Sequence, residues 1–302
     1  MAGWNELSNE ISHAIQVVGK SIVTVQAGGG RTSSGIILDD DTVLTTAHSV
    51  ADDESIRIWI SPDQPIPATL QGSDPSTDIA VLNIKDKIGP GAAFAENPQP
   101  VVGQFVVAVA RTWRGNLVAS SGILSGVMGE WNTFRGGKLE AFIRPDLTLH
   151  SGFPGGALIS ADQRILGMNT RALRRGSPLA VPHSTITRIT GILKEKGHIP
   201  KPYLGIGLQP VRLTESSRQK LNLTDDVGAL VVHVESDSPA DTAGLLVGDI
   251  LLRVQEQNFG VSGAASVIRR LSPSQNTEIS GIRGGQPFSA TVLVGERPRR
   301  RS

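Results

Sequence analysis

The chain has 302 residues, of which 39% are hydrophobic and 19% charged, a balance typical of folded globular domains and not of disorder. A formal net charge of +1 gives no overall attraction to nucleic acid or to an anionic membrane surface, so neither partner is expected. Because the sequence contains no cysteine, disulfides, cysteine–zinc sites and thiol catalysis are excluded.

The N-terminal segment predicts an amphipathic helix over 5–18, and we assign residues 1–13 to an N-terminal helical arm. The segment lacks the basic start and the unbroken apolar stretch of a signal peptide. No later stretch reaches the roughly eighteen apolar residues of a membrane span. We therefore expect a cytoplasmic location for the chain as given, or a periplasmic one if an export segment has been removed.

Short β-rich runs occupy most of the next 150 residues, separated by Gly, Asp, Pro or Ser. About ten to twelve such runs without intervening helices predict a closed barrel or a pair of packed sheets. The stretch "VPHSTITRITGILKEKG" then predicts one helix, with Ser184 or Thr185 as N-cap and Gly197 as its end. We expect a mainly β domain over 14–198.

A proline-containing joint, "GHIPKP", marks the best domain boundary, and we place a linker at 199–202. The following residues, 203–295, predict a small α+β module. Residues 296–302 form a basic tail that we expect to be solvated.

Three local signals shape the second module. Ser238 and Pro239 have the residue types of an N-cap and a first helical position, and Gly244 ends that short helix. A longer helix is expected from Ser262 to Leu271. Gly284-Gly285 between two β-rich runs predicts a hairpin turn.

Three motifs in the β-rich domain together suggest acyl-transfer chemistry. His48 ends a predicted strand, Asp78 begins another, and the glycine-rich turn "SGFPGGAL" follows about seventy residues later. A general base, a carboxylate that orients it and a tight turn that presents a nucleophile are the parts that such catalysis needs. Each motif alone has an ordinary structural explanation, but their order, with "TTAH" and "TDIAVL" around them, is harder to obtain by chance.

With these motifs the chain resembles the HtrA (Deg) family of trypsin-like serine proteases that carry a C-terminal PDZ domain. The resemblance runs from about Ala14 to Val294 and rests on "SSGIIL", "VLTTAH", "DPSTDIAVL", "SGILSGV", "GFPGGALI", "ILGMNT", "LAVPHSTITRI", "YLGI" and "SPADTAGLLVGDILLRV". It implies a mainly β fold, a chymotrypsin/trypsin-like double β-barrel followed by an α+β PDZ domain.

The resemblance assigns His48 as the general base and Asp78 as its orienting carboxylate. The family's nucleophile motif, GNSGG, aligns with residues 152–156, so Pro154 occupies the serine position. Proline has neither a hydroxyl nor an N–H, and the family's oxyanion hole uses the N–H groups of this position and of Gly152. Peptide hydrolysis is therefore not expected. Phe153 either fills the vacated cleft or lies exposed in the loop.

Two other chemistries are weaker interpretations of the same loop. Ser151 is a substitute nucleophile only if the turn brings it within about 3 Å of His48, which the family's geometry does not. A metal site on His48 and His150 lacks a placed carboxylate and is a weak ligand set. We expect no metal and no cofactor.

The PDZ resemblance places a carboxylate-binding loop at Tyr203, Leu204, Gly205 and Ile206, with one wall of the groove continuing through Leu208. The predicted helix forms the other wall and supplies Val267, Ile268 and Leu271. These aliphatic side chains predict a ligand with an apolar C-terminal residue. The alternative is that they are plain core and that the groove is closed.

The favoured interpretation is an HtrA-like pseudoprotease that binds peptides or protein C-termini and acts as a scaffold or adaptor. The alternatives are an active serine endopeptidase and a structural subunit of a larger complex. HtrA proteins commonly form trimers through N-terminal segments, a contact for which Trp4 and the helical stripe are available.

Overall fold

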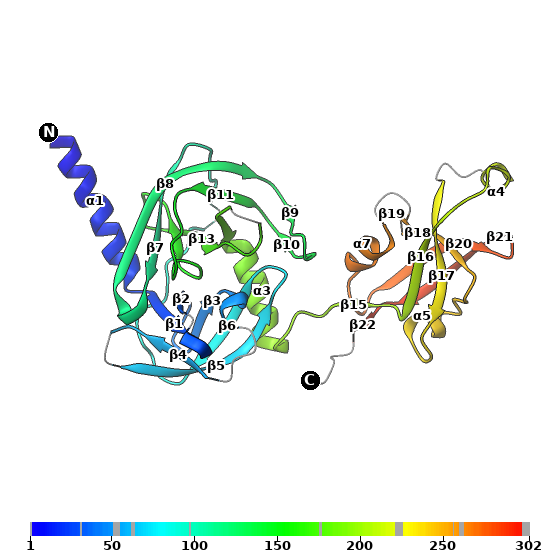
Figure 1. Ribbon diagram of the computed structural model, residues 1–302, viewed down its shortest axis with the longest axis horizontal. Coiled ribbons are helices and arrows are strands. Elements are labelled where there is room, and N and C mark those ends of the chain that lie inside the picture. The colour runs from blue at the N-terminus through cyan, green and yellow to red at the C-terminus, as the bar shows by residue number, and fades with distance from the viewer. Residues whose placement is uncertain are drawn as a thin grey trace. The chain divides into compact units, whose positions relative to one another are not determined.

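The computed structural model describes residues 2–30, 32–50, 55–61, 64–96, 98–174, 177–220, 226–255, 257–259 and 263–297. Two compact units divide the chain, one over Met1–Ile199 and one over Pro200–Ser302 (Figure 1). Most of the predicted basic tail, 298–302, and Ser262, the expected first residue of a helix, lie outside the described residues.

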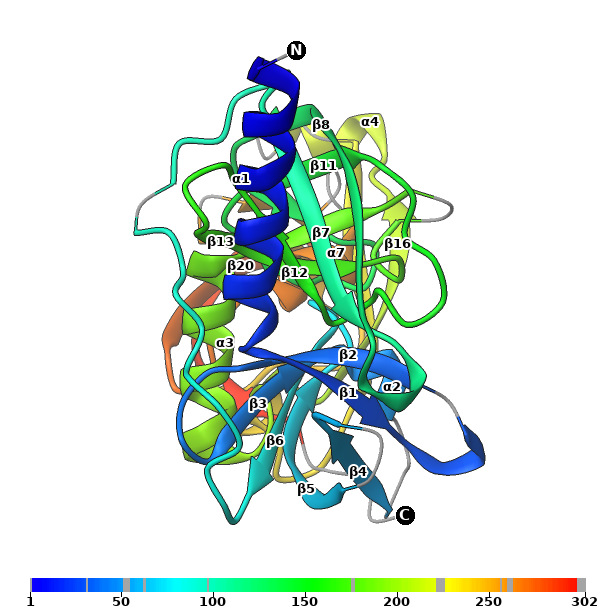
Figure 2. The same cartoon turned by 90° about the vertical axis from the view of Figure 1, so that its left-hand side faces the viewer.

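The first unit consists of two closed antiparallel barrels, as the sequence predicts (Figures 1 and 2). In the first barrel the neighbours run in the order β1-β2-β3-β6-β5-β4, and in the second β11-β14-β13-β12-β7-β8. The first-barrel strands are β1 Ile22–Gln26, β2 Thr32–Ile37, β3 Thr42–Thr45, β4 Ile56–Trp59, β5 Pro65–Asp74 and β6 Ile79–Ile84. The second-barrel strands are β7 Phe105–Arg111, β8 Leu117–Met128, β11 Phe142–Asp146, β12 Ala157–Ile159, β13 Ile165–Thr170 and β14 Leu179–Pro182.

Aliphatic side chains fill these barrels and the space between them. Ile36 and Leu44 of the first barrel share a buried cluster with Val109 and Met168 of the second, which joins the two barrels into one folding unit. The smaller elements of the unit are α1 Ala2–Gly19, η1 Gly28–Gly30, α2 Ala47–Val50, η2 Trp113–Gly115, the hairpin β9 Trp131–Asn132 and β10 Lys138–Leu139, and α3 His183–Lys196.

Helix α1 follows the predicted apolar stripe only in its second half. Ala14 and Val18 are buried in the shared cluster, whereas Trp4 is 80% exposed and Leu7 45% exposed. Figure 2 shows the helix running beside β7. The N-terminal half of α1 therefore presents apolar side chains to the outside of the chain.

The predicted N-cap of α3 is wrong, although its predicted end is confirmed. The helix begins at His183 with Pro182 as N-cap, and neither Ser184 nor Thr185 has that role. Pro182 is the last residue of β14, paired with Gly167, so the strand passes into the helix without a loop. Thr185 lies one turn inside, where its hydroxyl donates to Glu140. Gly197 ends the helix in a left-handed conformation with φ 71°.

The second unit is an α+β module around a sheet with the order β16-β17-β18-β20-β21. Ser238 caps α5 through its side chain and Pro239 is the first helical residue, as predicted. Its elements are β15 Pro202–Tyr203, β16 Ile206–Arg212, α4 Glu215–Lys220, β17 Val227–Val234, α5 Pro239–Thr242, β18 Ile250–Val254, β19 Gln257–Asn258, α7 Ala264–Arg269, β20 Asn276–Arg283, β21 Gln286–Leu293 and β22 Gly295–Glu296.

Two further sequence predictions concern this module. The hairpin is confirmed, because Arg283 pairs with Gln286 across Gly284 and Gly285, whose φ angles of 56° and 80° suit glycine. The helix predicted from Ser262 to Leu271 is shorter in the structure. Helix α7 spans Ala264–Arg269, and Leu271 lies beyond its end. Its N-cap is Gly263, a residue without a capping side chain.

Candidate functional site

His48 and Asp78 form a directly hydrogen-bonded pair in the first barrel. Helix α2 carries His48, and Asp78 immediately precedes β6. The Nδ1 atom of His48 lies 2.9 Å from both carboxylate oxygens of Asp78, and the backbone N–H of His48 donates to the same carboxylate at 3.0 Å. The His48 side chain is 39% exposed and that of Asp78 only 2%. The ring is therefore held from its buried side, with its other edge toward solvent.

Asp78 also ties the first barrel to the second. The hydroxyl of Thr170, at the end of β13, donates to the Asp78 carboxylate. The backbone carbonyl of Asp78 accepts from the N–H of Ala47 at 3.2 Å. Asp78 has a φ of 59°, a left-handed conformation that aspartate tolerates better than most side chains do. One buried carboxylate thus fixes α2, the start of β6 and the end of β13.

The turn before Asp78 is braced on both sides. Asp74 accepts hydrogen bonds from the N–H and hydroxyl of Ser76, at 3.0 and 2.6 Å, and from the hydroxyl of Thr77 at 2.7 Å. From the β9–β10 hairpin, Thr133 donates to the carbonyl of Ser76 at 2.8 Å. These contacts hold Asp78 in place independently of any catalytic role.

The glycine-rich loop at 152–156 is a closed turn that accommodates Pro154. The N–H of Gly156 donates to the carbonyl of Phe153 at 3.0 Å, which places Pro154 and Gly155 at the two central positions. A proline followed by a glycine at positive φ, here 86°, is the residue pair that a type II turn favours. A Cβ on Gly155 would lie 2.0 Å from the carbonyl oxygen of Ser34, so glycine is required there.

None of the bonds recorded for this turn needs an N–H at position 154. The Pro154 carbonyl accepts from the N–H of Ser34 at 2.9 Å, and the N–H of Gly155 donates to Asn169 at 2.9 Å. Proline therefore leaves the turn intact, and what it removes is the hydroxyl and the N–H that a nucleophile position would offer to a substrate.

Phe153 is buried, so the exposed placement considered from the sequence is wrong. Its side chain is 2% exposed and packs with Leu149, Ala108 and Ala110. The ring also meets His150 edge to face at a centroid separation of 5.8 Å. Ser151, by contrast, is exposed. The phenylalanine thus anchors the loop in the second barrel.

Ser34 and Arg111 support this loop and were not identified from the sequence. The Ser34 hydroxyl donates to the carbonyl of Gly152 at 2.7 Å and accepts from the N–H of Arg111 at 3.0 Å. The Arg111 guanidinium donates to the carbonyls of Ile22 and Gly19, at 2.6 and 3.0 Å, and its pKa is lowered by burial. Ser34 lies in the "SSGIIL" motif, which assigns it no role, and Arg111 lies in none, so only their tertiary contacts show that they support the loop.

In the second unit a cavity of about 510 Å³ lies where the carboxylate-binding loop is expected, a volume within the usual range of ligand pockets. Of the expected residues, the loop and Ile268 line it, whereas Val267 is 1% exposed in the core and Leu208 and Leu271 pack against that core. The cavity is lined by Pro202, Tyr203, Leu204, Gly205, Ile206, Gly207, His233, Glu235, Ile268, Arg269 and Arg297.

The polar side chains of this cavity were missed because they lie on strands outside the motif. His233 lies near the end of β17 and Glu235 directly follows that strand, whereas Arg297 follows β22, which pairs with β15 beside the loop. The hydroxyl of Tyr203 donates to Glu235, and this hydrogen bond, with burial and the negative charge, raises the pKa of Tyr203. Gly205 is required, since a Cβ there would lie 2.2 Å from the Cβ of Ser238.

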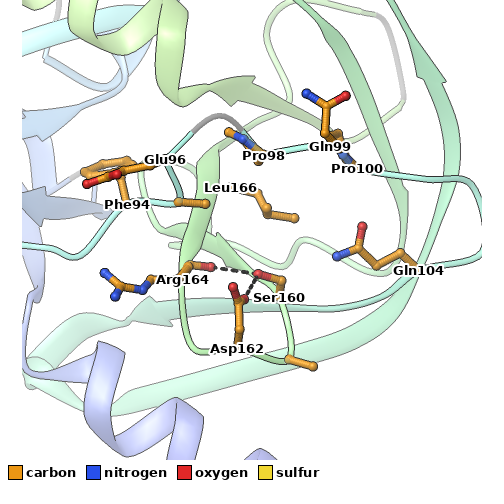
Figure 3. A pocket seen from close by; sticks show the side chains of 12 residues that line it. Phe94, Glu96, Pro98, Gln99, Pro100, Gln104, Ser160, Asp162, Arg164 and Leu166 are labelled. Carbon is orange, nitrogen blue, oxygen red and sulfur yellow. Dashed lines mark hydrogen bonds between the residues drawn. The ribbon is translucent and has the colours of Figure 1, made fainter.

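A third feature is a polar cavity of about 540 Å³ on the first unit (Figure 3). Ser160 donates to the carboxylate of Asp162 and to the carbonyl of Arg164, so the polar groups at its floor bond one another, as the dashed lines in Figure 3 show. Its lining includes neither His48 nor the 152–156 turn among the described residues. The cavity therefore belongs to a different part of the surface.

Comparison with known protein families matches residues 33–168 to the trypsin-like peptidase domain and 202–294 to the PDZ domain. Among curated proteins, the "Probable periplasmic serine endoprotease DegP-like" of Halomonas elongata is 28% identical over 272 residues, 88% of this chain and 56% of that protein. The protein of the same description from Chlamydia pneumoniae is 27% identical over 275 residues, covering 89% and 56%. The chain thus spans just over half the length of these relatives.

Solved structures show the same pair of domains. The serine endoprotease from Yersinia pestis superposes with a TM-score of 0.70 at 25% identity, covering 95% of this chain and 98% of that one. The HtrA-type protease AlgW with tripeptide gives a TM-score of 0.68 at 26% identity, covering 96% and 98%. Within the described residues of the present chain, no helix has the length and apolar character needed to cross a membrane.

Proposed function

We propose, from the premise that the chain belongs to the HtrA family of trypsin-like proteases with a PDZ domain, that this member binds protein C-termini without hydrolysing them and acts as a scaffold or adaptor. The observation that carries the proposal is Pro154 at the position aligned with the family's serine, in a chain whose His48–Asp78 pair is formed. Function is argued from this site and not from the fold, because one fold hosts many functions.

The loss of peptidase activity follows from what proline lacks. Without a hydroxyl, position 154 gives His48 no atom to activate, and removal of such a nucleophile costs on the order of 10⁶ in rate in a serine protease. Without an N–H, one of the two oxyanion donors is missing, a loss on the order of 10²–10³ by itself. The alternative of an active peptidase would need Ser151, which lies three residues away in sequence and is exposed.

The carboxylate-binding role of the second unit is supported by the orientation of its loop. The carbonyl of Leu204 accepts from Ala240 at 2.9 Å and that of Gly205 accepts from Glu235 at 2.8 Å, so both point into the module. In a trans peptide the N–H points opposite to the carbonyl. The N–H groups of Gly205 and Ile206 therefore point away from the module body, where they can bind a terminal carboxylate.

The lining of the groove favours an apolar last residue in the ligand. Ile268 of α7 and the loop residues Leu204 and Ile206 border the cavity, and Arg297 adds positive charge near the loop. Apolar contacts for the side chain and N–H groups for the carboxylate are the two parts of C-terminal recognition. A structural-subunit function differs from this proposal in leaving the groove without a peptide ligand.

Location and assembly complete the proposal. The relatives named above are described as periplasmic, which supports the extracytoplasmic of the two locations expected from the sequence. We propose a homo-oligomer, a trimer by analogy with the family, in which the exposed Trp4 and Leu7 of α1 contact neighbouring copies. Cross-linking with mass measurement tests this, and a monomer at micromolar concentration would contradict it.

Replacing Ile268 by glutamate tests the binding function. We expect the Kd for C-terminal octapeptides from a display library to rise by at least about tenfold, because a carboxylate would then face the ligand's own carboxylate across an apolar groove. Fluorescence anisotropy on the full chain measures this. Val247→Glu, at a 65% exposed position of the same unit, is the matched control and should bind as the unmodified chain does. Equal peptide affinities for the two variants would contradict the proposal that peptides bind in this groove.

A further inference from the structure

We infer that the groove beside β16 pairs fully with only the last four residues of its ligand, because Pro210 removes the next main-chain donor from the edge of the strand. This inference rests on the proposed function and specifies its ligand: a short free C-terminus, recognised without an extended upstream strand. The interruption comes from one residue, and the direction of its missing donor can be derived from hydrogen bonds at the two ends of β16.

Strand β16 lies at one end of the sheet order, with β17 as its paired neighbour. The other edge of β16 is where a peptide would add as a further strand, with main-chain hydrogen bonds supplying affinity. Which amides of β16 point to that edge decides how many such bonds a peptide can form.

The two ends of the strand give the same answer. Beyond its C-terminal end, the N–H of Leu213 donates to Asp226 at 2.8 Å, and before its N-terminal end the carbonyl of Gly205 accepts from Glu235 at 2.8 Å. The N–H of Leu213 and the carbonyl of Gly205 thus face the β17 side, and the N–H of Ile206, in the same peptide group as that carbonyl, faces the opposite way. In a β-strand the N–H and C=O of one residue share a side, and successive residues alternate. The even-numbered residues of β16 therefore face the free edge.

The bulge in this pair does not disturb the alternation. Gly207 pairs with His233 and Leu208 with Val231, so the unpaired extra residue is Val232, on β17. Strand β16 itself runs without an insertion, which is why its two ends agree.

Pro210 falls on the outward-facing set and is exposed. Its partner across the ladder is Ala229, at a position where no ladder bond to β17 is required of it. Edge positions with the nitrogen toward solvent are where sheets accept proline. The outward donors of β16 are accordingly Ile206 and Leu208, then a gap at Pro210, and then Arg212.

An antiparallel ligand meets these donors in a fixed order. With its carboxylate at the N–H groups of Gly205 and Ile206, the last residue of the ligand donates its N–H to the carbonyl of Ile206, and the third residue from its end exchanges both main-chain bonds with Leu208. The fifth residue from its end would face residue 210, which keeps an outward carbonyl but carries the proline ring where the N–H would be, so the ligand carbonyl there finds no donor. The two-bond pairing of the ladder therefore ends before the fifth residue.

Nested peptides test the inference on the full chain. The probes are fluorescein-labelled peptides of three to eight residues that share the C-terminus of the tightest binder from a C-terminal octapeptide library. We expect the Kd to fall up to four residues and to change by less than about twofold from four to eight. In Pro210→Ala the octapeptide should bind about threefold to tenfold more tightly than the tetrapeptide, the change in Kd expected for one restored hydrogen bond.

Two comparisons separate the possible outcomes. Pro287→Ala removes an exposed proline from β21, at the other end of the same sheet, and should show the plateau of the unmodified chain. An unchanged tetrapeptide Kd in Pro210→Ala shows that the loop is still folded. Affinity that rises steadily to eight residues in the unmodified chain, or a plateau that persists in Pro210→Ala, overturns the inference alone. Absence of binding at every length overturns the proposed function and the inference with it.

Discussion

Replacing Pro154 by serine is expected to create fluorophosphonate labelling where the unmodified chain has none, with a gain on the order of 10³ or more in labelling rate. The substitution supplies a hydroxyl and an N–H at the position that the family resemblance assigns to the nucleophile and to one oxyanion donor. The pair is already assembled, with Nδ1 2.9 Å from the carboxylate. The turn is held by Ser34 and Asn169 through bonds that do not involve the N–H of residue 154.

Two matched variants identify the origin of this gain. Pro154→Ala restores the N–H without the hydroxyl and should remain unlabelled. His48→Ala combined with Pro154→Ser removes the base and should lose the gain. Labelling of the unmodified chain at a rate similar to that of Pro154→Ser would show that another hydroxyl, such as that of Ser151, is reactive.

Replacing Asp78 by alanine is expected to lower the free energy of unfolding of the first unit by about 3 kcal/mol, although the chain is proposed to have no catalysis to lose. The carboxylate is 2% exposed and accepts from His48 and Thr170, whose buried donors would be left unpaired. Alanine also suits the left-handed backbone at this position less well than aspartate does. The retained pair is then explained as a structural tie between the barrels.

Denaturant unfolding of the variants measures this stability effect. His48→Ala is the internal comparison, with an expected loss of about 1 kcal/mol in the free energy of unfolding. The His48 ring is 39% exposed and contributes only its Nδ1 bond to Asp78, whereas Asp78 also accepts from Thr170. Asp78→Asn keeps the size and one acceptor oxygen and should lie between the two. A loss for Asp78→Ala no larger than that for His48→Ala would contradict the structural tie.

The sequence predicted the fold class well, because alternating aliphatic runs bounded by turn residues form most of the barrel strands. It missed β14, which lies directly before a predicted helix, and β5, whose prolines are poor signals for a strand. Pro65 and Pro67 pair with Trp59 and Arg57 of β4, whereas the pairing of β5 with β6 begins only at Ala68. At these two positions β5 is paired with a strand on one side only, so proline can be accommodated there. A pattern along the sequence does not reveal this one-sided pairing.

The sequence predicted the residues of the site that lie in motifs, but not the residues that hold them in place or complete the lining of the groove. His48, Asp78 and the 152–156 turn lie in recognisable local patterns, and the structure places the first two in contact. The roles of Ser34, Arg111, His233 and Arg297 depend on tertiary contacts between distant segments, which neither the "SSGIIL" motif around Ser34 nor any other local pattern reveals. For the same reason the aliphatic pattern of α7 did not separate Val267, which is core, from Ile268, which lines the groove.

The most direct test of the central claim, that this chain holds C-termini without cutting them, is the mass of a bound peptide. The full chain is incubated with the tightest octapeptide from the C-terminal library and with unfolded casein, and the peptide is recovered from the complex and weighed by mass spectrometry. We predict that the octapeptide is retained at its intact mass and that casein yields no fragments, while Pro154→Ser under the same conditions yields fragments. Cleavage of casein or of the peptide by the unmodified chain would contradict the account.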